Sequence, residues 1–112
     1  MNPKMLAIQT AFRSKHPKSR LGAVLVVGGK IISARPNLPA PGSMGICAEQ
    51  NVLRQLPREA YCGNRILYVA RITRDGVLAL ACPCERCQAF IRNKKILKVF
   101  HTTNEGGWKK ME

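Results

Sequence analysis

Two short segments of the chain carry side chains suited to metal chemistry. The first is C-A-E at residues 47–49, and the second is P-C-E-R-C at residues 83–87. Three thiolates leave the fourth position of a tetrahedral zinc ion open for water, and zinc lowers the pKa of that water to about 7. The inventory predicts a catalytic zinc site with Cys47, Cys84 and Cys87 as ligands and Glu49 as the group that moves protons.

The spacing around the cysteines carries most of the specificity. A C-x-x-C pair alone also occurs in structural zinc knuckles and redox pairs. Here a proline precedes the pair, a glutamate follows a third cysteine by two residues, and both segments open predicted helices. Unpaired N–H groups and the dipole at a helix start lower the pKa of a thiol. Both segments therefore suit metal binding.

The elements that must position these residues can be predicted from periodicity and turn signals. Helices are expected over residues 3–15, 47–56 and 84–94, and extended segments over residues 21–27, 30–35, 65–72, 77–81 and 96–103, with residues 108–111 long enough for one more short strand. In the first helix, Met5, Ile8 and Phe12 share a face that Leu6 and Ala11 widen, and this face should cover a sheet. The alternation predicts an α/β sandwich in which both cysteine-bearing helices start at the same sheet edge.

Length and charge limit the function classes. At 112 residues, the chain is expected to form one domain over residues 1–112, without a signal segment or an apolar run long enough to cross a membrane, and to be cytoplasmic. The formal charge of +13 favours anionic partners, either nucleotide phosphates or a polynucleotide backbone. The basic residues gather in two runs, Arg13, Lys15, Lys18 and Arg20 in the first and Arg92, Lys94, Lys95 and Lys98 in the second. Taken alone, each run is explained at least as well as a solvated face.

The remaining cysteines and the histidines have structural explanations. The chain has five cysteines, an odd number, and three of them are assigned to metal. A disulfide framework is therefore not expected. Cys62 is expected to be an ordinary free thiol, and Cys82 a small buried hydrophobe or a fourth ligand. His16 and His101 are expected to be structural, with a fourth-ligand role as the alternative.

The pattern C-A-E…P-C-x-x-C resembles the zinc-dependent cytidine and deoxycytidylate deaminase superfamily, whose more usual form is H-x-E…P-C-x-x-C. Residues 21–32 are also similar to the family's first hairpin. The resemblance implies a three-layer α/β sandwich with a mixed four- to five-stranded sheet flanked by helices. It also implies one Zn²⁺ per chain and Glu49 as the proton shuttle.

The resemblance extends to substrate-binding candidates and shows two departures. Asn37 aligns with an asparagine that holds the sugar or base edge, and the backbone N–H of Ala48 with one that contacts the base. Leu38 and Pro39 follow Asn37 at positions where classical cytidine deaminases have residues that bind the ribose. Gln50 stands where relatives with a cysteine ligand often carry an arginine that offsets thiolate charge. Helix N-termini and Arg86 are candidates for that offset.

Three functions are compatible with these residues. The first is hydrolytic deamination of a cytosine nucleoside or nucleotide, with a pyrimidine small molecule as partner and a homo-oligomer as the expected assembly. The second is deamination of cytosine or adenine in single-stranded DNA or RNA, which the charge supports and the few aromatic residues (one Trp, two Tyr, three Phe) oppose. The third is a non-catalytic zinc-stabilised binding module, which needs a fourth protein ligand.

Overall fold

A computed structural model describes residues 2–15, 19–38, 47–54, 56, 58, 63–83, 85–96 and 98–111. The helices are α1 (Pro3–Phe12), α2 (Ala48–Leu53) and α3 (Glu85–Asn93), and the strands are β1 (Arg20–Val27), β2 (Lys30–Pro36), β3 (Arg65–Ile72), β4 (Leu78–Ala79), β5 (Lys98–Thr102) and β6 (Trp108–Lys110). The predicted order of elements is confirmed, and α1 and α2 end earlier than their periodicity predicts.

The strands form one mixed sheet in the order β2-β1-β3-β5-β6, with β4 paired to β3. The β3–β5 pair is parallel, and the other pairs are antiparallel. The predicted α/β sandwich is confirmed. The sheet has six strands rather than four or five, because the two-residue β4 and the three-residue β6 both pair with it.

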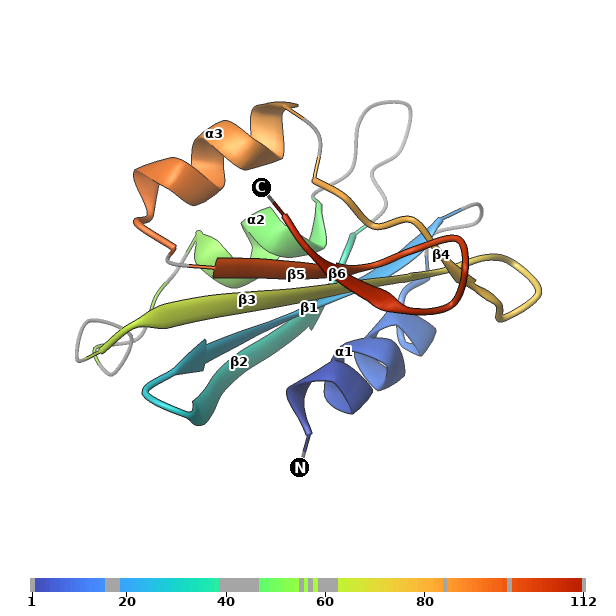
Figure 1. Cartoon of the computed structure of the whole chain (residues 1–112), viewed down its shortest axis with the longest axis horizontal. Helices are drawn as coiled ribbons and strands as arrows, with labels where there is room; N and C mark the ends of the chain where they lie inside the picture. The colour runs from blue at the N-terminus through green and yellow to red at the C-terminus, as the bar shows by residue number, and fades with distance from the viewer. Residues whose placement is uncertain are drawn as a thin grey trace.

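Helices cover both faces of the sheet. Figure 1 shows α2 and α3 on one side of it and α1 on the other. Strand β3 serves both layers because its side chains alternate: Leu67 and Val69 belong to the core with α2 and α3, whereas Tyr68 and Ala70 pack toward α1. Both cysteine-bearing segments therefore lie on one face.

Helix α1 covers the sheet as predicted only in part: Leu6 and Ile8 pack against the core, but two other residues of the predicted stripe do not. Met5 and Phe12 are 58% and 50% exposed, whereas Ala7, Thr10 and Ala11 are buried. The reason is Gly22 on β1: a Cβ there would collide with the backbone of Ala7 and Ala11. Helix and strand are so close at this point that only small side chains fit between them, and Met5 and Phe12 are turned outward.

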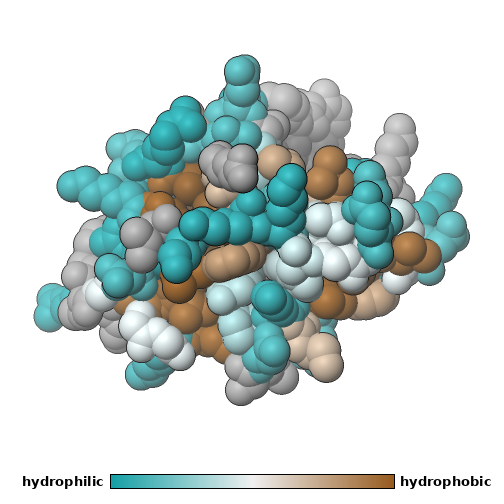
Figure 2. All heavy atoms as spheres, viewed as in Figure 1, coloured by the Kyte–Doolittle hydropathy of each residue, from teal (hydrophilic) through white to brown (hydrophobic). Residues whose placement is uncertain are grey.

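Hydrophilic side chains cover much of the face seen in Figure 2, and hydrophobic residues show between them in several separate places. Among the described helices, none has the length and apolar character needed to cross a membrane.

Candidate active site

The start of α2 places two of the predicted site residues. Cys47 is the N-cap residue, with extended backbone at φ −61° and ψ 148°, and Glu49 lies in the first turn. The Asn51 side chain donates to the Pro36 carbonyl at 2.8 Å, which ties this helix to the end of β2. Glu49 is consequently held inside the protein, at 3% exposure.

The segment before α3 is anchored through Thr102 on β5. Its hydroxyl donates to the Ala79 carbonyl at 2.6 Å, and its carbonyl accepts from the Ala81 N–H at 3.0 Å. The Gln88 side chain then closes the start of α3 by donating to the Pro83 carbonyl at 2.8 Å. These bonds fix the chain on both sides of Pro83, and Cys87 is buried against α2 as a result.

Three of the predicted chemical groups share one cavity of about 190 Å³. Cys47, Glu49 and Cys87 line it together. The other described lining residues come from the approach to β1, from β1 itself, from β3 and from the segment before α3: Ser19, Leu21, Arg71, Leu80, Ala81 and Cys82. The two motifs, which are distant in sequence, therefore meet as predicted.

Consecutive residues of α2 hold the sulfur of Cys87. The Glu49 carboxyl is hydrogen-bonded to the Cys87 side chain, and the Gln50 amide donates to the same sulfur at 3.8 Å. Burial raises the pKa of Glu49, and hydrogen bonds from its own backbone and from Cys87 oppose that rise. A carboxyl group with a raised pKa is suited to accept and return a proton near neutral pH.

The donor set that the structure describes is incomplete without Cys84. Cys84, Cys62 and His16 lie outside the described residues. Within the described ranges, no three His, Cys, Asp or Glu side chains gather closely enough to hold a metal ion. Cys47 and Cys87 are not in disulfides and face one cavity. Two thiol groups beside a carboxyl fit zinc, whose preferred ligands include Cys sulfur.

The two substrate-binding candidates occupy different environments. Ala48 is fully buried next to Cys47. The Asn37 side chain is also buried, and its oxygen accepts from the Ser14 hydroxyl and from the Leu21 N–H at 2.9 Å. Its amide nitrogen donates to the Ser19 carbonyl at 2.9 Å. Neither Asn37 nor Ala48 is among the described residues that line the cavity, but Asn37 is bonded to Ser19 and Leu21, which do line it.

Arg71 is a site residue that the motif search did not find. It lies on β3, two residues beyond Val69, and lines the cavity with Glu49. The available signal was a charged residue inside a strand that is otherwise mostly apolar. His101 and Trp108 are not among the lining residues: the His101 ring bonds the Thr102 carbonyl at 3.0 Å, and Trp108 packs edge-on against Tyr68 on the α1 face.

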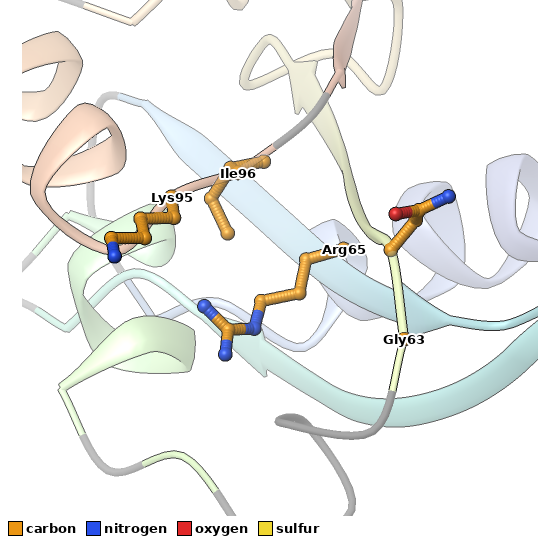
Figure 3. A pocket seen from close by; sticks show the side chains of 5 residues that line it. Gly63, Arg65, Lys95 and Ile96 are labelled. Atoms are coloured by element: carbon orange, nitrogen blue, oxygen red, sulfur yellow. The ribbon is translucent and has the colours of Figure 1, made fainter.

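A second cavity, of about 460 Å³, lies at the other end of β3. Gly63, Asn64, Arg65, Lys95 and Ile96 line it. Figure 3 shows the Arg65 and Lys95 side chains extending to the same side. Arg65 donates to the Lys94 carbonyl at 2.6 Å, so it caps the end of α3. This basic cavity contains none of the predicted metal or proton-transfer residues.

The geometry defines a class of protein: a cytidine deaminase-like α/β sandwich with cysteines and a buried glutamate at two helix starts. Residues 4–103 match the family described as the cytidine and deoxycytidylate deaminase zinc-binding region. The chain belongs to this family, whose expected cofactor is zinc.

Solved structures of similar fold include two bacterial cytidine deaminases. The enzyme from Burkholderia pseudomallei is 20% identical with a TM-score of 0.72, and the match covers 98% of this chain and 89% of that one. The enzyme from Mycobacterium leprae is also 20% identical with a TM-score of 0.63, covering 96% and 88%. At this identity the likeness shows the fold. The sequence search of curated proteins found no match.

Proposed function

We propose that this protein is a zinc-dependent hydrolytic deaminase that converts a cytosine nucleoside or nucleotide to the uracil form and releases ammonia. The observation that carries the proposal is the meeting of Cys47, Glu49 and Cys87 in one cavity. Membership of the deaminase family supports the reaction class. Residues 1–112 would form the single deaminase domain.

Each residue has a defined task in this proposal. Cys47, Cys84 and Cys87 hold one zinc ion, which when bound supplies a Lewis acid that lowers the pKa of water. Glu49 would take one proton from the attacking water and deliver it to the ring nitrogen, and would then take the remaining hydroxyl proton and pass it to the amine, which leaves as ammonia. The raised pKa of its carboxyl supports this double role.

Asn37 and Ala48 remain our candidates for holding the substrate. The Ala48 N–H would face the base beside Glu49. Asn37 is bonded to Ser14, Ser19 and Leu21, so in this proposal it orders the wall on which the base or sugar rests. Cytoplasmic localisation and self-association remain predictions.

Deamination within single-stranded nucleic acid is a second candidate function. The observation that favours it is the basic cavity at the far end of β3, together with an adjoining cavity of about 300 Å³ lined in part by Arg65, Lys94 and Lys95. With a formal charge of +13, these cations would bind phosphates along a strand. The few aromatic residues still oppose this candidate.

A substrate panel tests the proposal. Ammonia release is measured with the zinc-loaded protein on cytidine, deoxycytidine, their monophosphates and single-stranded oligonucleotides, at low and high salt. We expect a cytosine nucleoside or nucleotide to be converted at a rate that salt changes little. Activity confined to oligonucleotides, falling steeply with salt, would assign the second candidate instead. Release from no member would overturn the cytosine assignment.

A further inference from the structure

Arg71 is a residue of the sheet that lines the cavity of the candidate active site. It lies on β3, where its register partners are Leu21 on β1 and Ala79 on β4. Alternation along the strand puts Arg71 on the same face as Leu67 and Val69, whose side chains pack toward α2 and α3. Its side chain accordingly lines the cavity that Cys47, Glu49 and Cys87 share.

One donor of the half-buried Arg71 guanidinium group lacks the partner that burial normally requires. Its Nε is buried without a hydrogen-bond partner, the one such side-chain atom found among the described residues. Its Nη1 makes a long hydrogen bond of 3.4 Å to the Leu80 carbonyl. Within the described ranges, no carboxylate is paired with it. A buried N–H donor without a partner is costly unless an acceptor arrives.

The charges of the loaded site would provide that partner. A zinc ion with three thiolates carries a formal charge of −1. Gln50, which contacts the Cys87 sulfur, is neutral. Arg86 is exposed on α3 and is not a lining residue. Arg71 is the one cationic side chain among the described residues that line the cavity.

We propose that Arg71 supplies the positive charge that stabilises a three-thiolate zinc site in this protein. The inference rests on the ligand set of the proposed function. Arg71 is a charge-balancing residue here, since its side chain lines the cavity and its buried Nε has a donor to spare for the anionic site. The metal-free protein leaves that donor without a partner, so metal binding and the state of Arg71 are coupled.

The test compares zinc affinity and thermal stability in the full chain. The variants are Arg71→Met, which keeps a straight side chain and removes the charge, and Arg71→Lys, which keeps the charge. Lys95→Met is the matched control because it removes one charge at the basic cavity instead. Zinc affinity is measured by competition with a chromophoric chelator, and melting temperatures are measured with and without zinc.

We expect Arg71→Met to weaken zinc binding by roughly 10- to 100-fold, the range typical of outer-shell partners, while raising the melting temperature of the metal-free protein. Arg71→Lys should recover part of the affinity, and Lys95→Met should bind zinc like wild type. Unchanged zinc affinity in Arg71→Met overturns this inference and leaves the proposed function standing. Unchanged affinity with an increased KM for substrate assigns Arg71 to substrate binding. Failure of the wild-type protein to bind zinc overturns both proposals.

Discussion

The carboxyl group of Glu49 on α2 is hydrogen-bonded to the side chain of Cys87 on α3, and the amide of Gln50 donates to the same sulfur at 3.8 Å. Two neighbouring residues of one helix therefore fix a predicted metal ligand on the other. Because both helices rest on the face of β3 that presents Leu67 and Val69, the sheet sets the distance between the two motifs.

Zinc binding by Cys→Ser variants distinguishes the cysteines that are metal ligands from the one that is not. We predict that Cys47→Ser, Cys84→Ser and Cys87→Ser each reduce zinc affinity by more than the roughly 100-fold that loss of an outer-shell partner costs. Cys82→Ser is the control, because Cys82 is exposed yet lines the same cavity. It should retain one zinc per chain in metal analysis. Loss of zinc from Cys82→Ser as well would indicate four thiolate ligands and a structural site.

Glu49 should make the metal-free protein less stable as pH rises. Its folded-state pKa is raised above the ordinary value of 4.5 by burial, so the folded chain holds this proton more tightly than the unfolded chain. The stability this group contributes is fully present below 4.5 and is lost as pH rises through the folded-state pKa. Metal-free Glu49→Gln should then be more stable than wild type near neutral pH, with the difference shrinking toward acid.

Urea unfolding of both chains in the presence of a chelator, at a series of pH values, measures this difference. Glu85→Gln is the matched control, since it makes the same change on the exposed first turn of α3. The control should follow the wild-type profile. A constant difference between Glu49→Gln and wild type at every pH would show that ionisation of Glu49 is not the cause.

Asn37 should contribute to the stability of the fold as well as to substrate binding. Asn37→Ala leaves the Leu21 N–H and the Ser19 carbonyl without the bonds they now make, and we expect a loss on the order of 1–3 kcal/mol for each group left unsatisfied. Ser14→Ala removes the hydroxyl that donates to the Asn37 side chain and, at 3.5 Å, to the Asn37 carbonyl, and it should cost less. Chemical denaturation gives both values. Equal stability of Asn37→Ala and wild type would contradict the structural role.

Gly22 should be essential to the contact between α1 and β1. Gly22→Ala puts a methyl group against the backbone of Ala7 and Ala11, and overpacking of this kind costs about 1–3 kcal/mol or more. Gly63→Ala is a suitable control, because its nearest neighbour, the Val27 side chain, would be at an ordinary 3.4 Å. Thermal unfolding should separate the two variants clearly, and similar melting temperatures would contradict the close approach.

The cysteine and glutamate motifs could be predicted from sequence because their chemistry depends on residue type and short spacing. The order of elements followed from turn signals such as Gly28 and Gly29, which both adopt positive φ. The packed face of α1 could be predicted only in part, because helical spacing marks Met5 and Phe12 as apolar without showing that Gly22 lets the backbone approach too closely for them. The sequence alone did not assign Arg71 to the site. Its position in the cavity depends on the register of the sheet and on the loop that carries Leu80, and neither can be read from local spacing.

Ammonia release by zinc-loaded wild type and Glu49→Gln, with Glu85→Gln as control, tests the central claim most directly. The proposed function predicts that wild type and Glu85→Gln convert a cytosine substrate with one ammonia per uracil product. It also predicts that Glu49→Gln keeps one zinc per chain while its rate falls by roughly 10²- to 10⁴-fold. Glu49→Gln acting at the wild-type rate would contradict the assignment of this carboxyl as the proton shuttle.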